Sequence, residues 1–436
     1  MIERNLMQDL VKWKNVRSRK PLILRGVRQC GKTWLLQEFG KRHFENVAYF
    51  NFEREEGLGD IFEKNLEPDR ILLELSVVHG KKIQPQTTLI IFDEIQACPR
   101  ALTALKYFCE EEPEFAIVAA GSLLGITLST PGTSFPVGKV TFLELNPCGF
   151  DEYLRTVDNG LQEYCESLQK PEPLSLAICD KLEQRFREYL VLGGMPAVLS
   201  DFIENQDVQQ AEAIQQGIIQ SYEMDFSKHA PHKDMPKLFL LWKSIPEQLA
   251  RENAKFIYGE VKTGARAKDL EDALRWQLEA GLIQKVNWLE KPEIPLAAYE
   301  DRKSFKVYLS DTGLLRNLAK VPASSVLINN DVFGEFKGRL VENYVLQQLT
   351  ALGNAPVYYW SSGNLAEVDF VIQQDRDIIP IEVKSGLNVR SRSLKAYREK
   401  YRPPYAIRFS LQNLKLDHGL LNIPLYLIGQ YRQFIV

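Results

Sequence analysis

Residues 26–33, GVRQCGKT, lie between a short apolar run and a helical pattern. The apolar run at residues 22–24 fits a buried parallel strand, and the pattern after the loop continues as a helix until Gly40. The eight residues match G-x-x-x-x-G-K-[ST], in which backbone N–H groups surround the phosphates of a nucleotide. Because the match stands between a strand and a helix, the context that makes the motif specific, it predicts a phosphate-binding loop.

The residues of this loop have distinct predicted roles. Lys32 is expected to reach the β and γ phosphates of ATP, and Thr33 is expected to hold a Mg²⁺ ion. The helix N-terminus also favours negative charge. The rest of the predicted nucleotide-binding set contributes mainly its backbone: Gly26, Arg28, Gln29, Cys30 and Gly31.

A second buried run, residues 88–92, ends in Asp93 and Glu94. Ligands of open α/β sheets bind at the carboxyl ends of the strands. Asp93 is therefore predicted to hold Mg²⁺ through water, and Glu94 to act as the catalytic group that orients or deprotonates the attacking water. Since such a carboxylate is needed only for hydrolysis, the sequence predicts a Mg²⁺-dependent ATPase rather than a passive ATP-binding protein.

A third apolar run, residues 115–120, precedes Ser122. On a neighbouring strand, this hydroxyl could sense the γ phosphate as a further catalytic group, or it could be a simple turn serine. The residue type does not separate these two interpretations.

Composition limits the class of protein. The 436 residues carry a net charge of −3, with 45% hydrophobic and 25% charged residues, typical of a soluble globular protein of several domains. Residues 1–15 lack a signal-peptide core, and the most apolar stretch, residues 115–128, is too short to span a bilayer. No C-x-x-C pair occurs among the cysteines, so we expect a cytoplasmic protein with reduced thiols.

Periodicity divides the chain into four expected domains. Residues 1–150 alternate strands and helices, which predicts an α/β P-loop core of AAA type with a doubly wound parallel sheet. Residues 151–234 have helical patterns and are interpreted as a lid. His229 and His232 near its end are interpreted as part of a linker, because the intervening proline prevents a helical metal-binding pair. A winged helix at residues 235–328 and an α/β domain at residues 329–436 complete the prediction.

The winged helix is predicted from a helix, a helix-turn-helix and a two-stranded ribbon. Its candidate nucleic-acid contacts near a helix start are Lys262, Arg266 and Lys268. The alternative is a winged helix used only for protein packing or as a lid, because three acids that follow would weaken a DNA-binding face: Asp269, Glu271 and Asp272.

The last hundred residues contain a second chemical cluster. Glu382 and Lys384 point to the same face of a predicted strand, and hairpin pairing can bring Asp369 beside them. Glu342 lies near the start of a preceding helix. The carboxylates of Glu342, Asp369 and Glu382 are candidate ligands for a divalent cation, and Lys384 could polarise a phosphate or water. The basic segment that follows, which includes Arg390 and Arg392, is either a patch that follows a nucleic-acid backbone or a solvated helix face.

The order of several stretches resembles that of bacterial and archaeal AAA-type ATPases of the signal-transduction branch that carry a C-terminal domain of unknown function. These stretches are RGVRQCGKT, IIFDEIQ, AAGSLL, FPVGKVTFLELNPCGFDEYL, LGGMP, VYLSDTGLL, GRLVENYVLQQL, and EVDFVI followed by PIEVKSG. The resemblance covers the whole chain and implies a PD-(D/E)xK nuclease-like fold at its end, with Glu342, Asp369, Glu382 and Lys384 at the motif positions. Where relatives often have Gly-Arg, this chain has Gly138 and Lys139. Because lysine lacks the planar fork of arginine, the resemblance does not supply a phosphate-contacting arginine at this position.

Two classes of function follow. In the first, ATP and Mg²⁺ control a winged helix and a nuclease-like domain that act on nucleic acid. In the second, the chain is an ATP-switched regulatory or partner-binding protein whose nuclease-like domain does not cleave. The expected partners are ATP, DNA or another nucleic acid, and further copies of the chain, with no membrane partner.

Overall fold

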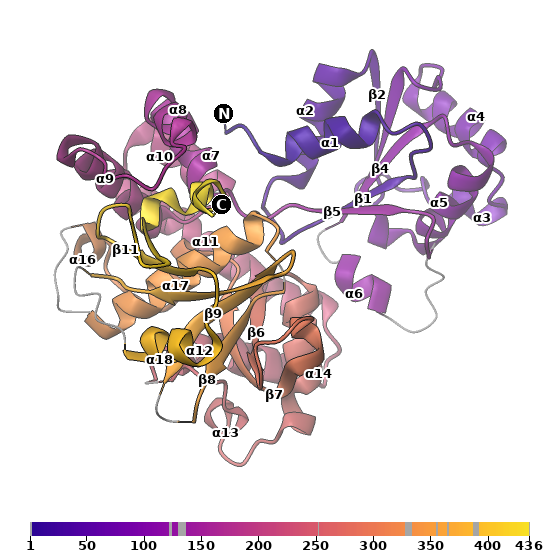
Figure 1. Ribbon diagram of the computed structural model, residues 1–436. Coiled ribbons are helices and arrows are strands. Elements are labelled where there is room, and N and C mark those ends of the chain that lie inside the picture. The colour runs from indigo at the N-terminus through magenta and orange to yellow at the C-terminus, as the bar shows by residue number, and fades with distance from the viewer. Residues whose placement is uncertain are drawn as a thin grey trace. The chain divides into compact units, whose positions relative to one another are not determined.

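The computed structural model describes residues 2–121, 124–129, 137–251, 253–327, 334–354, 356–363, 366–386 and 392–435. The chain forms two compact units (Figure 1). The N-terminal unit contains residues 3–146 with 279–281, and the C-terminal unit contains residues 1–2, 147–278 and 282–436. Within the described residues, no helix is both long and apolar enough to cross a membrane.

The N-terminal unit is built on a parallel sheet with the strand order β2-β3-β4-β1-β5. Its strands are β1 (Leu22–Arg25), β2 (Asn46–Asn51), β3 (Thr88–Asp93), β4 (Ala116–Ala120) and β5 (Thr141–Glu144). Its helices are α1 (Leu6–Lys14), α2 (Lys32–His43), α3 (Asp60–Lys64), α4 (Pro68–His79), η1 (Ile95–Ala97), α5 (Pro99–Glu111) and α6 (Leu124–Ser129). The predicted α/β class and the parallel sheet are confirmed.

The middle of this sheet is buried on both faces. Every residue of β3 and β4 is buried, as near-continuous apolar runs predict for parallel strands that are covered on both sides. One strand, β4, separates the strand that carries the glycine-rich loop from the strand that ends in Asp93. The parallel direction of these strands places their carboxyl ends at one edge of the sheet.

The C-terminal unit begins with helices, as expected for residues 150–230. They are α7 (Phe150–Val157), α8 (Asn159–Ser167), α9 (Leu176–Leu192), α10 (Pro196–Asn205) and α11 (Val208–His229). The helices α12 (Met235–Ala250), α13 (Tyr258–Val261) and α14 (Ala267–Glu279) then precede the hairpin of β6 (Ile283–Leu289) and β7 (Glu300–Leu309). This order is the one expected for a winged helix, and the winged-helix assignment remains a prediction.

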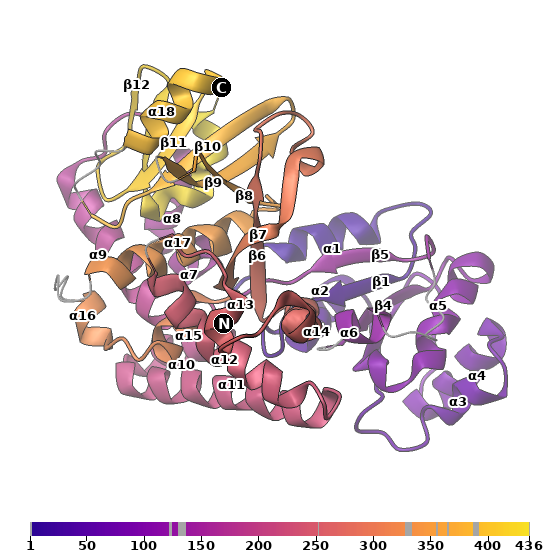
Figure 2. The same cartoon turned by 90° about the horizontal axis from the view of Figure 1, so that it is seen from below.

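A single eight-stranded mixed sheet contains this hairpin, in the order β12-β13-β11-β10-β9-β8-β6-β7 (Figure 2). The other strands are β8 (Tyr358–Ser361), β9 (Glu367–Gln374), β10 (Asp377–Val383), β11 (Ala406–Ser410), β12 (Lys415–Asp417) and β13 (Leu420–Pro424). The accompanying helices are η2 (Leu296–Tyr299), α15 (Thr312–Leu318), α16 (Ala323–Leu327), α17 (Gly334–Ala351), α18 (Arg392–Tyr401) and η4 (Leu425–Phe434). Because β6 pairs in parallel with β8, the sheet runs across the predicted domain boundary at residue 328.

A buried carboxylate, Asp311, joins three separate stretches of the C-terminal unit. It accepts hydrogen bonds from the backbone N–H groups of Gly194 at 2.6 Å and Leu314 at 2.9 Å. The side chain of Gln347 on α17 accepts from the N–H and hydroxyl of Thr312 at 2.9 and 2.8 Å. Gln347 also donates to the Tyr189 hydroxyl at 3.0 Å. The LGGMP, SDTGLL and ENYVLQQL stretches therefore meet in one network of polar groups.

Burial raises the pKa of Asp311 to about 6, although backbone N–H groups and Gln347 oppose the shift. The folded state thus holds the proton more strongly than the unfolded chain does. The contribution of Asp311 to stability is consequently present at low pH and is lost as the pH rises through about 6.

A glycine is required at position 193, next to the buried carboxylate of Asp311. The φ of 72° and ψ of −164° at Gly193 are unfavourable for residues with a side chain, and a Cβ would lie 2.2 Å from Asp311 Oδ1. We expect Gly193→Ala to lower the free energy of unfolding by roughly 2–5 kcal/mol, measured by denaturant titration of tryptophan fluorescence. Gly217→Ala is the matched control, because this exposed position in α11 has open space around it and should gain about 0.5–1 kcal/mol. Equal effects of the two variants would contradict the requirement for glycine at 193.

Candidate nucleotide-binding site

The glycine-rich loop connects β1 to α2, as predicted. Three of its residues have positive φ: Gly26 at 145°, Gln29 at 65° and Gly31 at 93°. A Cβ on Gly26 would lie 2.2 Å from the carbonyl oxygen of Leu145, so only glycine fits where the loop leaves β1. Cys30 is buried, Arg28 is half-buried and Gln29 is exposed. The local backbone therefore has the tight form that a phosphate-binding loop requires.

Lys32 folds back over the loop that precedes it. Its Nζ donates hydrogen bonds to the carbonyl oxygens of Gly26 at 2.8 Å and Val27 at 2.9 Å. The side chain is almost fully buried. A buried ammonium needs such partners, and phosphate oxygens could replace these carbonyls. The positive charge of Lys32 thus lies beside the backbone of the glycine-rich loop.

Thr33 and Asp93, the two residues predicted to hold Mg²⁺, are in direct contact. The Thr33 hydroxyl donates to Asp93 Oδ2 at 2.9 Å. Tyr49 on β2 donates to the same oxygen at 2.7 Å, and the Glu94 backbone N–H donates to Asp93 Oδ1 at 3.1 Å. Burial, assisted by Asp93, raises the pKa of Tyr49 to about 12, so its hydroxyl keeps its proton at neutral pH. Tyr49 was missed by sequence reasoning, since a tyrosine in a strand is an ordinary apolar-face residue.

Glu94 follows β3 in a left-handed conformation with φ 49° and ψ 43°. Its Oε2 accepts a hydrogen bond from Gln96 Nε2 at 2.5 Å. Gln96 packs against the end of β4, because a Cβ on Gly121 would lie 2.0 Å from Gln96 Oε1. The catalytic candidate is thereby linked to the strand that leads to Ser122, which lies outside the described residues.

Arg4 is a second residue that sequence reasoning missed. This buried side chain donates from Nη1 to the Cys30 carbonyl at 2.9 Å and from Nη2 to the Asn146 carbonyl at 2.6 Å. It therefore fastens the glycine-rich loop to the chain that follows β5. An arginine in an amphipathic N-terminal segment gives no sign of this role.

The second predicted cluster is also brought together in space. Asp369 on β9 and Glu382 on β10 lie on adjacent antiparallel strands, and the Val383 N–H donates to Asp369 Oδ2 at 2.7 Å. Lys384 Nζ lies 2.5 Å from Glu382 Oε1. Asp369 keeps some solvent exposure, but burial and then the charges of Glu382 and Glu342 raise its pKa well above the ordinary value. Asp369, Glu382 and Lys384 therefore lie close together in the structure, and their role as a nuclease-like site remains a prediction.

Each carboxylate of this cluster has a partner within the protein. Glu342 accepts from Arg339 at 2.8 Å and from the Tyr308 hydroxyl at 3.1 Å. Lys306 on β7, with no exposed side-chain surface, pairs with Glu367 at 2.5 Å. Among the residues that the structure covers, no group of three or more His, Cys, Asp and Glu side chains is arranged to hold a metal ion. Within the cluster, as far as the structure describes the chain, the buried Glu382 Oε2 lacks a hydrogen-bond partner.

The predicted nucleic-acid contacts lie at two surfaces. Lys262, Arg266 and Lys268 are exposed around the start of α14. Arg392 is exposed at the start of α18, and Arg390 lies outside the described residues. The aromatic residues between the basic residues of α18 face inward: Tyr397 is buried, and its ring lies 5.1 Å from that of Trp360. Tyr397 is thus not available for stacking on a base.

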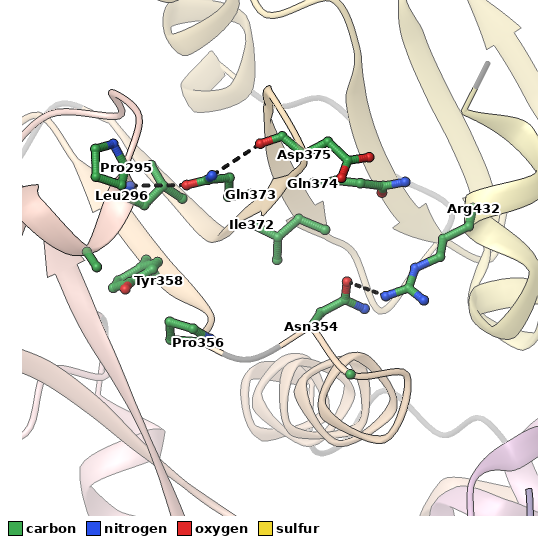
Figure 3. Close-up of a pocket in the computed structure, with 12 residues that line it drawn as sticks. Pro295, Leu296, Asn354, Pro356, Tyr358, Ile372, Gln373, Gln374, Asp375 and Arg432 are labelled. Atoms are coloured by element: carbon green, nitrogen blue, oxygen red, sulfur yellow. Dashed lines mark hydrogen bonds between the residues drawn. The ribbon is translucent and has the colours of Figure 1, made fainter. Parts of the chain in front are cut away.

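A separate hollow of about 540 Å³ lies at the turn between β9 and β10 (Figure 3). Gln373 accepts from the Leu296 N–H at 3.2 Å and donates to the Asp375 carbonyl at 3.2 Å. Across the hollow, Arg432 donates to Asn354 at 2.9 Å. None of the predicted site residues lines it.

Comparisons with known proteins identify one domain of known type. An AAA domain model matches residues 18–154. Two models described as domains of unknown function, DUF8612 and DUF4143, match residues 183–325 and 337–428. No protein of curated function matches. The chain therefore contains a region that matches an AAA domain, followed by regions for which these models state no function.

Solved structures with detectable similarity share little sequence with the chain. The Walker-type ATPase PABY2304 of Pyrococcus abyssi is 15% identical, over 73% of this chain and 96% of that one, with a TM-score of 0.48. The ORC2 protein of Aeropyrum pernix is 14% identical, over 77% and 90%, with a TM-score of 0.34. The Cdc6p protein of Pyrobaculum aerophilum is 14% identical, over 74% and 93%, with a TM-score of 0.28.

The contact of Tyr49 with Asp93 gives a specific prediction. Tyr49→Phe removes the hydroxyl that orients a predicted metal-binding carboxylate, so the affinity for ATP with Mg²⁺ should fall about 10-fold. Affinity for ATP in excess chelator should not change, because the glycine-rich loop remains intact. Calorimetric titration measures both values. Tyr107→Phe on α5 of the same unit is the control, and an unchanged response to Mg²⁺ in Tyr49→Phe would show that the contact has no role.

Proposed function

We propose that the N-terminal unit binds ATP with Mg²⁺ and hydrolyses it. The observation that carries this proposal is the 2.9 Å contact between Thr33 and Asp93. It joins the start of α2 to the end of β3, with Lys32 on one side and Glu94 on the other. The residues present fit a bound nucleotide and its metal, because a cation, two oxygen ligands and a carboxylate that can orient water meet at one edge of a parallel sheet.

The roles of the residues follow from their present partners. Lys32 would exchange the carbonyls of Gly26 and Val27 for phosphate oxygens and so stabilise negative charge. Thr33 would hold the metal directly, and Asp93 would hold it through water. When bound, Mg²⁺ supplies positive charge that offsets the phosphates. Glu94 would exchange Gln96 for water, orient that water and accept its proton.

Two substitutions separate nucleotide binding from hydrolysis. Lys32→Ala should abolish ATP binding, because it removes the cation from the loop. Glu94→Gln should bind ATP with nearly wild-type affinity but lose turnover by about 100-fold or more, because the amide cannot accept a proton. Phosphate release and fluorescent-nucleotide binding provide the two measurements. Unchanged turnover in Glu94→Gln would require a different residue to act on the water.

For the C-terminal unit, we propose that nucleotide state controls contact with nucleic acid. The exposure of Lys262, Arg266 and Lys268 beside a helix start supports this role. The carboxylate cluster supports an action on phosphates. Glu382 Oε2 is buried without a hydrogen-bond partner and could bind a divalent cation, and the neighbouring Lys384 could polarise a phosphate. A cation at this position would offset the repulsion by Glu382 and Glu342 that, after burial, raises the pKa of Asp369.

A second candidate function is a switch that binds its partner without cleavage. It is favoured by one observation: Glu342 is already paired with Arg339 and Tyr308. The positive charge of Arg339 offsets the negative charge of Glu342 and so weakens the attraction of this acid for a cation. The two candidates differ in whether the cluster binds a divalent cation.

Metal-induced stabilisation distinguishes these candidates. If the cluster binds Mn²⁺, millimolar Mn²⁺ should raise the melting temperature of the C-terminal unit in the wild type but not in Asp369→Asn. DNA or RNA cleavage should disappear in the same variant. Asp375→Asn is the matched control, because this exposed acid lies in the β9–β10 turn, away from the cluster. Absence of both the Mn²⁺ effect and cleavage in the wild type would favour the non-cleaving switch.

A further inference from the structure

Helix α4 of the N-terminal unit has apolar residues on two faces. Ile71 and Leu75 are buried in the core of the unit, where α4 packs against α3 and α5. On the outside, Leu73 is 68% exposed and Val77 is 75% exposed. The neighbouring Val78 is 53% exposed. The outward apolar side chains of α4 therefore do not pack in the core of the unit.

The exposed side chains form a continuous surface rather than scattered positions. Leu73 and Val77 are four residues apart, so they lie one above the other on the helix. Beside them, a hollow of about 570 Å³ extends the surface toward Ile83 and Phe115. Contiguous apolar patches on a soluble domain mark interaction sites more often than single exposed residues do.

Opposite charges stand at the two ends of this surface. Asp69, four residues before Leu73, is exposed at the start of α4. Lys81 and Lys82, both exposed, follow the end of α4. A second acid, Glu112, lies beside Asp69 at this end. The order along the surface is thus acidic, apolar, basic.

We propose that α4 pairs with α4 of a second copy of this chain in an antiparallel arrangement around a two-fold axis. Leu73 of each copy would contact Val77 of the other. Lys81 and Lys82 of each copy would face Asp69 and Glu112 of the other, and both ends of the contact would be neutralised.

The pattern of charge along α4 favours a second copy of this chain as the binding partner of this surface. An antiparallel pair of identical acidic-apolar-basic surfaces matches opposite charges at both ends, whereas a parallel pair would place like charges together. The opposed helix dipoles also favour the antiparallel pair. Such a contact is isologous and closes at two copies. Because the apolar patch is small relative to interfaces of about 1,200–2,000 Å², the dimer should be weak and dependent on concentration.

Charge reversal on the full chain tests this pairing. Sedimentation equilibrium of the wild type should show a monomer–dimer equilibrium between about 1 and 100 µM, a range that suits a small interface. The double variant Lys81→Glu with Lys82→Glu, and the single variant Asp69→Lys, should each weaken self-association by about 10-fold or more. Mixing these two proteins should restore dimers, because opposite charges then meet at both ends of the contact.

Substitutions of exposed apolar residues distinguish association through the proposed surface from nonspecific hydrophobic association. Leu73→Ser with Val77→Ser should abolish the dimer. Leu176→Ser, at a leucine that is 78% exposed on α9, should leave the dimer unchanged. Far-UV circular dichroism checks that each variant is folded, and ATP hydrolysis is not needed for any of these measurements. A wild type that is monomeric at 100 µM, a dimer that survives both charge reversals, or failure of the mixture to associate would each overturn the proposal.

Discussion

The hydrogen bond from Thr33 to Asp93 is the contact on which the candidate nucleotide-binding site of the N-terminal unit depends. It joins the first turn of α2 to the last residue of β3, across a sheet in which β4 separates β1 from β3. Thr33 and Asp93 can meet across β4 because the strands are parallel and their carboxyl ends lie at one edge of the sheet. Tyr49, Arg4 and Lys32 then fix the surrounding groups through hydrogen bonds that are buried or partly buried. The edge of this parallel sheet thereby carries the residues that we propose bind phosphates and a metal.

The C-terminal unit depends on a different constraint, the cost of burying charge. Asp311 is stabilised by backbone N–H groups from two chain segments, and its pKa still rises to about 6. Lys306 is fully buried and depends on Glu367. Since removing one partner of such a pair leaves an uncompensated charge, these contacts hold the hairpin of β6 and β7 to the sheet of the C-terminal strands. The hairpin is therefore part of the framework around the carboxylate cluster.

Much of this arrangement could be predicted from the sequence, because the relevant patterns are local. The glycine-rich loop, the run that ends in Asp93, and the alternation around Glu382 and Lys384 each depend on a few neighbouring residues. What could not be predicted depends on pairing across the chain. Whether β6 lies beside β8 is decided by partners about 70 residues apart, a separation at which strand patterns carry no pairing information. Tyr49, Arg4 and Lys306 were missed for the same reason, since their roles arise from contacts with distant backbone or acids.

Phosphate release by the purified wild-type chain, followed with ATP in the presence of Mg²⁺ and then in excess chelator, tests the central claim most directly. The geometry around Thr33, Asp93 and Glu94 predicts release that continues beyond one phosphate per chain with Mg²⁺ and stops when the metal is removed. Tight binding of ATP with no Mg²⁺-dependent release above that of Glu94→Gln would contradict it.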